Sequence, residues 1–75
     1  MTPQEKSAIE LAWAAKKRAG DAITRAKDQL TRAGLAKVPM DQIQQLDLAY
    51  QSAVVADAAA LEAVADAMRA AGFNV

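Results

Sequence analysis

The side chains that could do chemistry in this chain are two serines and a scatter of charged residues. Ser7 and Ser52 are hydroxyl nucleophiles, but the sequence has no histidine to act as their general base and no cysteine. The carboxylates lack the Glu-x-x-His spacing by which helical bundles hold paired metal ions. The three glycines lie apart and form no phosphate-binding loop. We therefore predict no catalytic residues, no metal ligands, no cofactor and no enzymatic activity.

One basic cluster has the chemistry of a phosphate contact. Lys17, Arg18 and Arg25 lie close together on a helix and could face a nucleic-acid backbone. Asp21 and Asp28 follow the two arginines by three residues, which predicts a ladder of ion pairs on a solvated face. The chain carries nine basic and nine acidic residues, for a net charge of 0. Nucleic acid is therefore not the expected partner.

Three large apolar residues are candidates for contact with a protein partner. Trp13 is the only tryptophan, and Leu48 and Val55 lie seven residues apart in the second half of the chain. An aromatic side chain among small residues can anchor an interface. It can equally edge a helical core. Both roles stay open for Trp13, and the second requires no partner.

Apolar spacing predicts the long helices that position these residues. In the first half of the chain alanine recurs at every seventh residue, which marks one side of a heptad seam. The full seam comprises Ile9, Ala12, Lys16, Ala19, Ile23, Ala26, Leu30 and Ala33. Because alanine is small, a second helix can approach this seam closely. The pattern therefore predicts helix-on-helix packing.

Capping residues set the expected ends of the first helix. Thr2, Pro3 and Glu5 have the pattern of a capping box, with proline at the first helical position. Gly34 suits the left-handed position that follows a last helical turn. The first helix is therefore expected over about residues 3–33.

The second helix is expected over about residues 41–71, with Asp41 as its N-cap. The alternative start places Pro39 at the first helical position. Gly72 suits the left-handed position after the last turn. Two helices of equal length with a short connection predict an all-α fold, an antiparallel two-helix hairpin in one domain over residues 1–75.

One charge within each apolar seam indicates the register. If the numbers of facing residues sum to about 73, Lys16 meets Asp57 and Ile9 meets Val64. A charge inside a seam needs its counter-charge, so this coincidence favours the register. The pair either lies within the seam or is solvated because Lys16 extends outward.

The apolar surface of the second helix is wider than one neighbouring helix can cover. Val54, Leu61 and Met68 form a stripe beside its seam. The first helix has seven basic and four acidic residues, net +3, and the second has one basic and five acidic residues, net −4. The opposite net charges therefore attract the first helix to the second, both within one hairpin and between two hairpins. We predict a homodimer that forms a four-helix bundle and covers this stripe.

Composition gives a class of function without naming a partner. The longest uncharged run, Leu48 to Ala56, is too short to cross a bilayer, and the N-terminus lacks a signal-peptide core. A cytoplasmic protein that does not enter membranes is expected. We predict an interaction module of the anti-defence type, which acts as an inhibitor or adaptor of a larger protein complex such as a host defence complex. Small free-standing helical proteins of this kind are often phage or mobile-element products.

Two alternatives stay open. The first is a structural subunit of a virion or another assembly, which predicts repeating contacts in place of a closed dimer. The second is a dimeric hairpin that binds RNA or DNA through Lys17, Arg18 and Arg25. In layout, though in no motif, the chain resembles the small dimeric hairpins that bind plasmid RNA.

Overall fold

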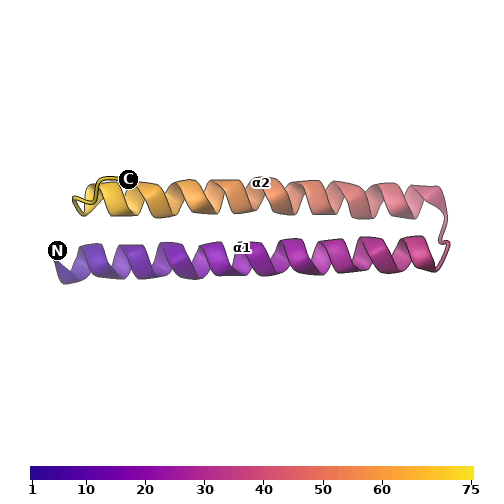
Figure 1. Ribbon diagram of the computed structural model, residues 1–75, viewed down its shortest axis with the longest axis horizontal. Helices are drawn as coiled ribbons and strands as arrows, with labels where there is room; N and C mark the ends of the chain where they lie inside the picture. The colour runs from indigo at the N-terminus through magenta and orange to yellow at the C-terminus, as the bar shows by residue number, and fades with distance from the viewer.

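The computed structural model describes all 75 residues as two long antiparallel helices joined by a short loop (Figure 1). Helix α1 spans Pro3–Leu35 and helix α2 spans Met40–Ala70. The backbone forms a rod of 53 × 14 × 14 Å with both termini at the same end. The predicted all-α hairpin is confirmed.

The start of α1 is the predicted capping box. The Thr2 backbone N–H donates to Glu5 Oε1 at 2.9 Å, and the Glu5 backbone N–H donates to Thr2 Oγ1 at 3.1 Å. Two of the free N–H groups at the helix end are thereby satisfied. The bond from the Thr2 backbone favours the ionised carboxylate and lowers the pKa of Glu5 below its ordinary value of 4.5.

The end of α1 differs from the expected one. The helix continues through Gly34 and Leu35, and Lys37 adopts the left-handed conformation, with φ 56°. The Lys37 N–H donates to the Gly34 carbonyl at 3.4 Å, and the Val38 N–H donates to the Ala33 carbonyl at 3.3 Å. This is a Schellman closure with lysine where glycine is usual. The later ending ties half-buried Val38 to buried Ala33 through this backbone bond. An apolar contact between these two positions commonly accompanies a Schellman closure, and it would offset the conformational preference of glycine.

Two substitutions test this ending. Lys37→Gly should raise the free energy of unfolding by about 1 kcal/mol, because the left-handed conformation is unfavourable for a residue with a Cβ. Gly34→Ala should raise it by about 0.5–1 kcal/mol, since alanine favours helix and its Cβ would meet nothing within 4 Å. Urea unfolding followed by circular dichroism measures both changes. A destabilised Gly34→Ala variant would mean that the helix ends at Gly34.

The start of α2 lies between the two expected positions. Pro39 is the N-cap and makes no side-chain capping bond, while Met40 is the first helical residue. Asp41 is therefore not the N-cap, and Pro39 is not the first helical residue. The cause is the backbone of Pro39, whose ψ of 148° is extended and belongs to the loop. Asp41 lies in the first turn, where its charge still favours the helix dipole.

The end of α2 confirms the predicted role of Gly72. This residue has φ 95°, and its N–H donates to the Arg69 carbonyl at 3.0 Å. The Phe73 N–H donates to the Met68 carbonyl at 3.0 Å, which completes a Schellman closure. The last helical residue is Ala70, one residue earlier than expected.

The core of the hairpin is a single apolar seam. Only Ala33 and Val64 are buried. The other seam positions are half-buried: Ile9, Ala12, Lys16, Ala19, Ile23, Ala26 and Leu30 in α1, and Ile43, Leu46, Tyr50, Ala53, Asp57, Ala60 and Ala67 in α2. Two helices side by side shield one stripe of each other and leave the rest to solvent.

Candidate interaction surface

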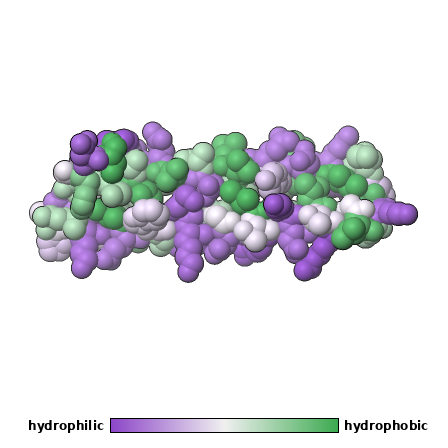
Figure 2. Space-filling model, viewed as in Figure 1, coloured by the Kyte–Doolittle hydropathy of each residue, from purple (hydrophilic) through white to green (hydrophobic).

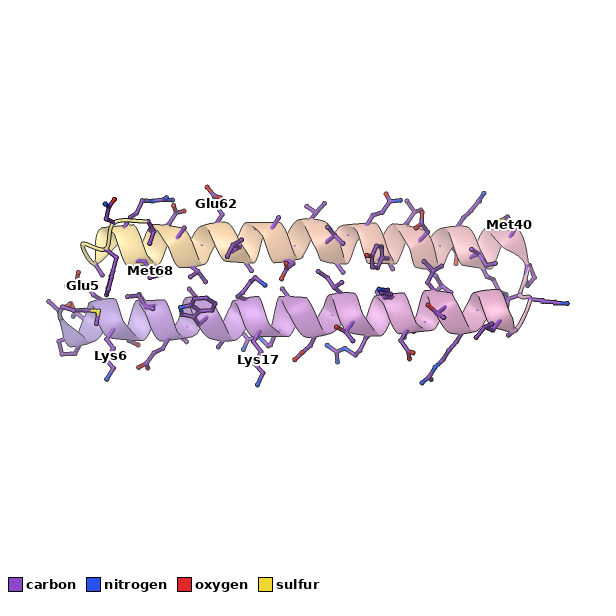
Figure 3. The ribbon with its side chains drawn as sticks, in the orientation of Figure 1. Glu5, Lys6, Lys17, Met40, Glu62 and Met68 are labelled. Carbon is purple, nitrogen blue, oxygen red and sulfur yellow. The ribbon has the colours of Figure 1, made fainter.

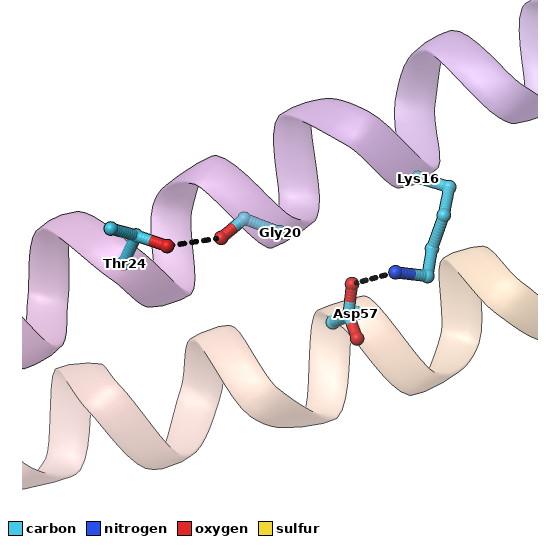
Figure 4. Close-up of polar contacts among 4 residues, drawn as sticks. All are labelled: Lys16, Gly20, Thr24 and Asp57. Carbon is cyan, nitrogen blue, oxygen red and sulfur yellow. Dashed lines mark hydrogen bonds and ion pairs between the residues drawn. The ribbon is translucent and has the colours of Figure 1, made fainter.

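The charged pair in the seam fixes the register of the hairpin. Lys16 Nζ lies 2.8 Å from Asp57 Oδ1 (Figure 4). The two side chains are 26% and 24% exposed, and Oδ1 itself is buried and accepts no hydrogen bond from another group. Of the two expected arrangements, the pair therefore lies within the seam. The predicted facing of Lys16 and Asp57 is confirmed.

Gly20 lies beside this ion pair, where α1 faces α2. A Cβ at this position would lie 3.9 Å from Asp57 Oδ1, which is an ordinary contact. The Gly20 carbonyl accepts a hydrogen bond from Thr24 Oγ1 at 3.3 Å (Figure 4). Close packing within the hairpin therefore does not require glycine here.

One side of the hairpin carries larger apolar residues and is named the Trp13 flank. Lys16 and Asp57 occupy equivalent heptad positions in the two seams. In antiparallel helices, the residues four positions after such a position lie on the same side of the hairpin. Two residues are called level when they lie at the same height along the long axis of the hairpin. Because Lys16 faces Asp57, Trp13 is level with Leu61, and Gly20 is level with Val54. The flank comprises Lys6, Trp13, Gly20 and Lys27 from α1, and Asp47, Val54, Leu61 and Met68 from α2.

The predicted contact residues differ in how far they reach into solvent. Trp13, Val54 and Leu61 are between 41% and 52% exposed, as expected at the edge of the seam. Met68 is already half-buried within the hairpin. It therefore exposes less apolar surface to a second copy than the predicted stripe of Val54, Leu61 and Met68 assumed. Leu48 and Val55 are 63% and 69% exposed and lie on the side of α2 that faces away from α1. The register set by Lys16 and Asp57 places Trp13 and Leu61 at the same height on one side of the hairpin, whereas the heptad position of Leu48 lies on the outer side of α2.

The facing of two charged residues of the Trp13 flank was not predicted from the sequence. Lys27 and Asp47 lie at the same level once the register is known. Asp47 Oδ2 accepts a hydrogen bond from Gln51 Nε2 at 2.8 Å, and neither Lys27 nor Asp47 forms an ion pair in the hairpin. Their heptad positions predict that both lie on the same side of the hairpin. Only the register shows that they are level with each other.

The opposite side of the hairpin, named the alanine flank, carries only small side chains along most of its length. Its members are Ala8, Ala15 and Ala22 from α1, and Ala49, Ala56, Ala63 and Ala70 from α2. Ala15 and Ala22 are half-buried, and the others are exposed. The two flanks therefore offer different amounts of apolar surface to a partner.

The predicted ladder of ion pairs on α1 is formed at one rung only. Arg32 Nε lies 3.0 Å from Asp28 Oδ2, whereas Arg18 and Arg25 form no ion pair. Exposed ion pairs are weak because ordering long side chains offsets most of the attraction. Lys17 is also unpaired and points away from α2 (Figure 3).

Polar and apolar surfaces are distributed unequally over the two helices. In the view of Figure 2, green apolar surface recurs along α2 and the junction, while the outer edge of α1 is mostly purple. Lys6 and Lys17 point outward from α1, and Glu62 points outward from α2 (Figure 3). With α1 at net +3 and α2 at net −4, each hairpin has a basic side and an acidic side.

The hairpin exposes more surface than a compact monomer of its mass. Its accessible area is 5508 Å² for 7.9 kDa. The scaling of area with mass gives about 4,400 Å² for a compact monomer of this size. Eleven large hydrophobic residues are exposed, against two buried residues in total. The apolar surface is therefore too large for the hairpin to cover alone.

Helix α2 also meets a purely compositional criterion for a membrane-spanning helix. It is long and apolar enough to cross a bilayer, and 6% of the qualifying stretch is buried in the hairpin. The interface helix of a bundle has the same composition, so this criterion is weak evidence. The expected exclusion from membranes stays a prediction.

The hairpin has no pocket and no group of three side chains able to hold a metal ion. No family model matches the chain, and comparisons with characterised proteins and with solved structures find no match either.

Proposed function

We propose that the protein is a non-catalytic helical interaction module that self-associates and acts in the cytoplasm as an inhibitor or adaptor of a larger protein complex. The observation that supports this proposal is the exposure of eleven large hydrophobic residues in a hairpin where Val64 is the only large residue that is buried. Extended apolar surface on a small protein usually marks an interface.

Marginal stability gives a second reason for association. A chain of 75 residues has a small interior, and here that interior is one seam between two helices. Single cores of this size rarely supply more than about 3–5 kcal/mol. Association with a second surface buries further apolar area and stabilises the fold by mass action.

The outer face of α2 is the better candidate for a foreign protein. Leu48 and Val55 are the most exposed large residues in the middle of that helix, and no part of the hairpin covers them. They also lie farther from the seam than Trp13 and Leu61 do. A dimer that used the flank would leave both residues free for a larger partner.

Light scattering coupled to size-exclusion chromatography tests self-association directly. We expect the mass of a dimer at concentrations of about tens of micromolar, and a shift toward monomer in a Val54→Gln/Leu61→Gln variant. Ala59→Gln is the matched control, because it adds a similar polar group to an exposed position of α2. A monomeric mass for the unmodified chain would contradict the proposal. A mass that grows without limit would favour a structural subunit.

Nucleic-acid binding is the second candidate, and one observation favours it. Lys17, Arg18 and Arg25 form no ion pairs, so their charges are free for phosphate. The affinity for nucleic acid would then fall steeply as the salt concentration rises, and it would also fall in an Arg18→Ala variant. Arg69→Ala is the control, since it removes an arginine from α2 that already pairs with Asp66 at 2.6 Å. Equal binding by both variants would exclude this basic face.

A further inference from the structure

We propose that the second copy of this chain packs on the Trp13 flank, with α1 of each copy lying antiparallel against α2 of the other. The two-fold axis then runs parallel to the helices, between the two hairpins. This inference rests on the proposed self-association and specifies its surface and orientation.

The area available matches what a dimer needs. Each hairpin exposes roughly 1,100 Å² more than a compact monomer of its mass. A standard interface buries about 800 Å² on each partner. Covering one flank of a rod 53 Å long would therefore remove most of the excess surface.

The Trp13 flank fits a protein interface better than the alanine flank does. Trp13, Val54 and Leu61 are between 41% and 52% exposed, and they share this flank with Gly20, which has no side chain. Large residues beside a small one allow two such surfaces to interdigitate. Aromatic anchors of this kind contribute most of the free energy of many interfaces. The alanine flank offers no comparable anchor.

Charge selects the orientation. If like helices were apposed, an α1 of net +3 would lie on another α1, and an α2 of net −4 on another α2. If unlike helices are apposed, a helix of net +3 lies along a helix of net −4 at both contacts. Unlike charges across an interface favour one arrangement and disfavour the other.

The levels of the flank residues select the same orientation. With the axis parallel to the helices, level is conserved, so Trp13 lies over the partner's Leu61 and Gly20 over the partner's Val54. Lys27 then meets the partner's Asp47. If like helices were apposed about their midpoints near Gly20, Trp13 would lie over the partner's Lys27. That alternative would bury the Lys27 charge against the aromatic anchor. In the proposed arrangement the charge that lies over an apolar residue is Lys6, over Met68 near the end of the rod.

Cysteine cross-linking tests the arrangement, because the chain has no cysteine of its own. A Gly20→Cys chain is mixed with a Val54→Cys chain, allowed to exchange and then oxidised under mild conditions. We expect the mixed disulfide between the two variants, identified by its mass. Mixed Ala15→Cys and Ala56→Cys chains report on the alanine flank and are expected to cross-link poorly.

The other outcomes separate this inference from the proposed function. Disulfides within Gly20→Cys alone and within Val54→Cys alone, without the mixed product, would overturn the orientation. Cross-linking of the Ala15→Cys and Ala56→Cys mixture would overturn the choice of flank. Both results would leave self-association standing, whereas a monomeric mass for the unmodified chain would overturn both proposals.

A pair of charge reversals provides a test without oxidation. Lys27→Glu and Asp47→Lys should each weaken dimerisation about tenfold or more, and the double variant should recover most of the loss. A double variant as weak as either single one would overturn the predicted contact between these residues.

Discussion

Replacing Lys16 with methionine is expected to destabilise the hairpin by about 2 kcal/mol. The Asp57 oxygen that faces the ammonium group is buried and has no other partner, so the substitution leaves an unpaired charge in the seam. Removing one partner of a fully buried pair removes about 3–5 kcal/mol of stability. The side chains here keep about a quarter of their exposure, so we expect a smaller effect. Urea unfolding gives the value directly.

The neighbouring lysine provides the matched control. Lys17 points away from α2 and forms no ion pair (Figure 3), so Lys17→Met should change stability by less than about 0.5 kcal/mol. A Lys16→Met/Asp57→Leu double variant should recover the loss or exceed the original stability, because an apolar pair fits the seam. Equal effects of Lys16→Met and Lys17→Met would show that the ion pair contributes nothing.

The same ion pair explains how much of the fold the sequence could predict. An apolar seam of constant period specifies helix type, length and the face that is covered, and a charge in each seam specifies the level at which the helices meet. These properties depend on many residues acting together. For that reason the hairpin, its capping box and the facing of Lys16 and Asp57 were predicted correctly.

The ends of the helices at the loop were not predicted correctly, because there the competing energies are small. Ending α1 at Gly34 satisfies the backbone preference of glycine, while ending it three residues later allows an apolar contact between Val38 and Ala33. Each preference is worth about 1 kcal/mol. Local sequence cannot decide between them, since the balance depends on where α2 begins.

The candidate interaction surface was only partly predictable for a related reason. Trp13, Val54 and Leu61 were recognisable as residues beside a seam, but their levels relative to Lys27 and Asp47 follow from the register alone. The predicted ion-pair ladder on α1 was right only for Arg32 and Asp28. Spacing shows which charges can meet, but it does not report the entropy cost of ordering exposed side chains.

Substitution of Val64 by alanine is expected to lower the free energy of unfolding by about 1.5 kcal/mol. Val64 is 3% exposed and is the only large side chain buried in the hairpin. Loss of two buried methyl groups removes about 2 kcal/mol, and the higher helix propensity of alanine returns about 0.5 kcal/mol. Because a hairpin of this size has little stability to lose, the midpoint of thermal unfolding should fall by roughly 6 °C or more.

Val55 is the internal control for Val64, since it is the same residue type on the same helix and is 69% exposed. In dilute protein, Val55→Ala should leave stability unchanged or raise it by up to about 0.5 kcal/mol, because only helix propensity changes. A loss equal to that of Val64→Ala would mean that Val55 is covered under those conditions. A loss that appears only as protein concentration rises would place Val55 in the contact between copies and would remove it as a site for a foreign partner.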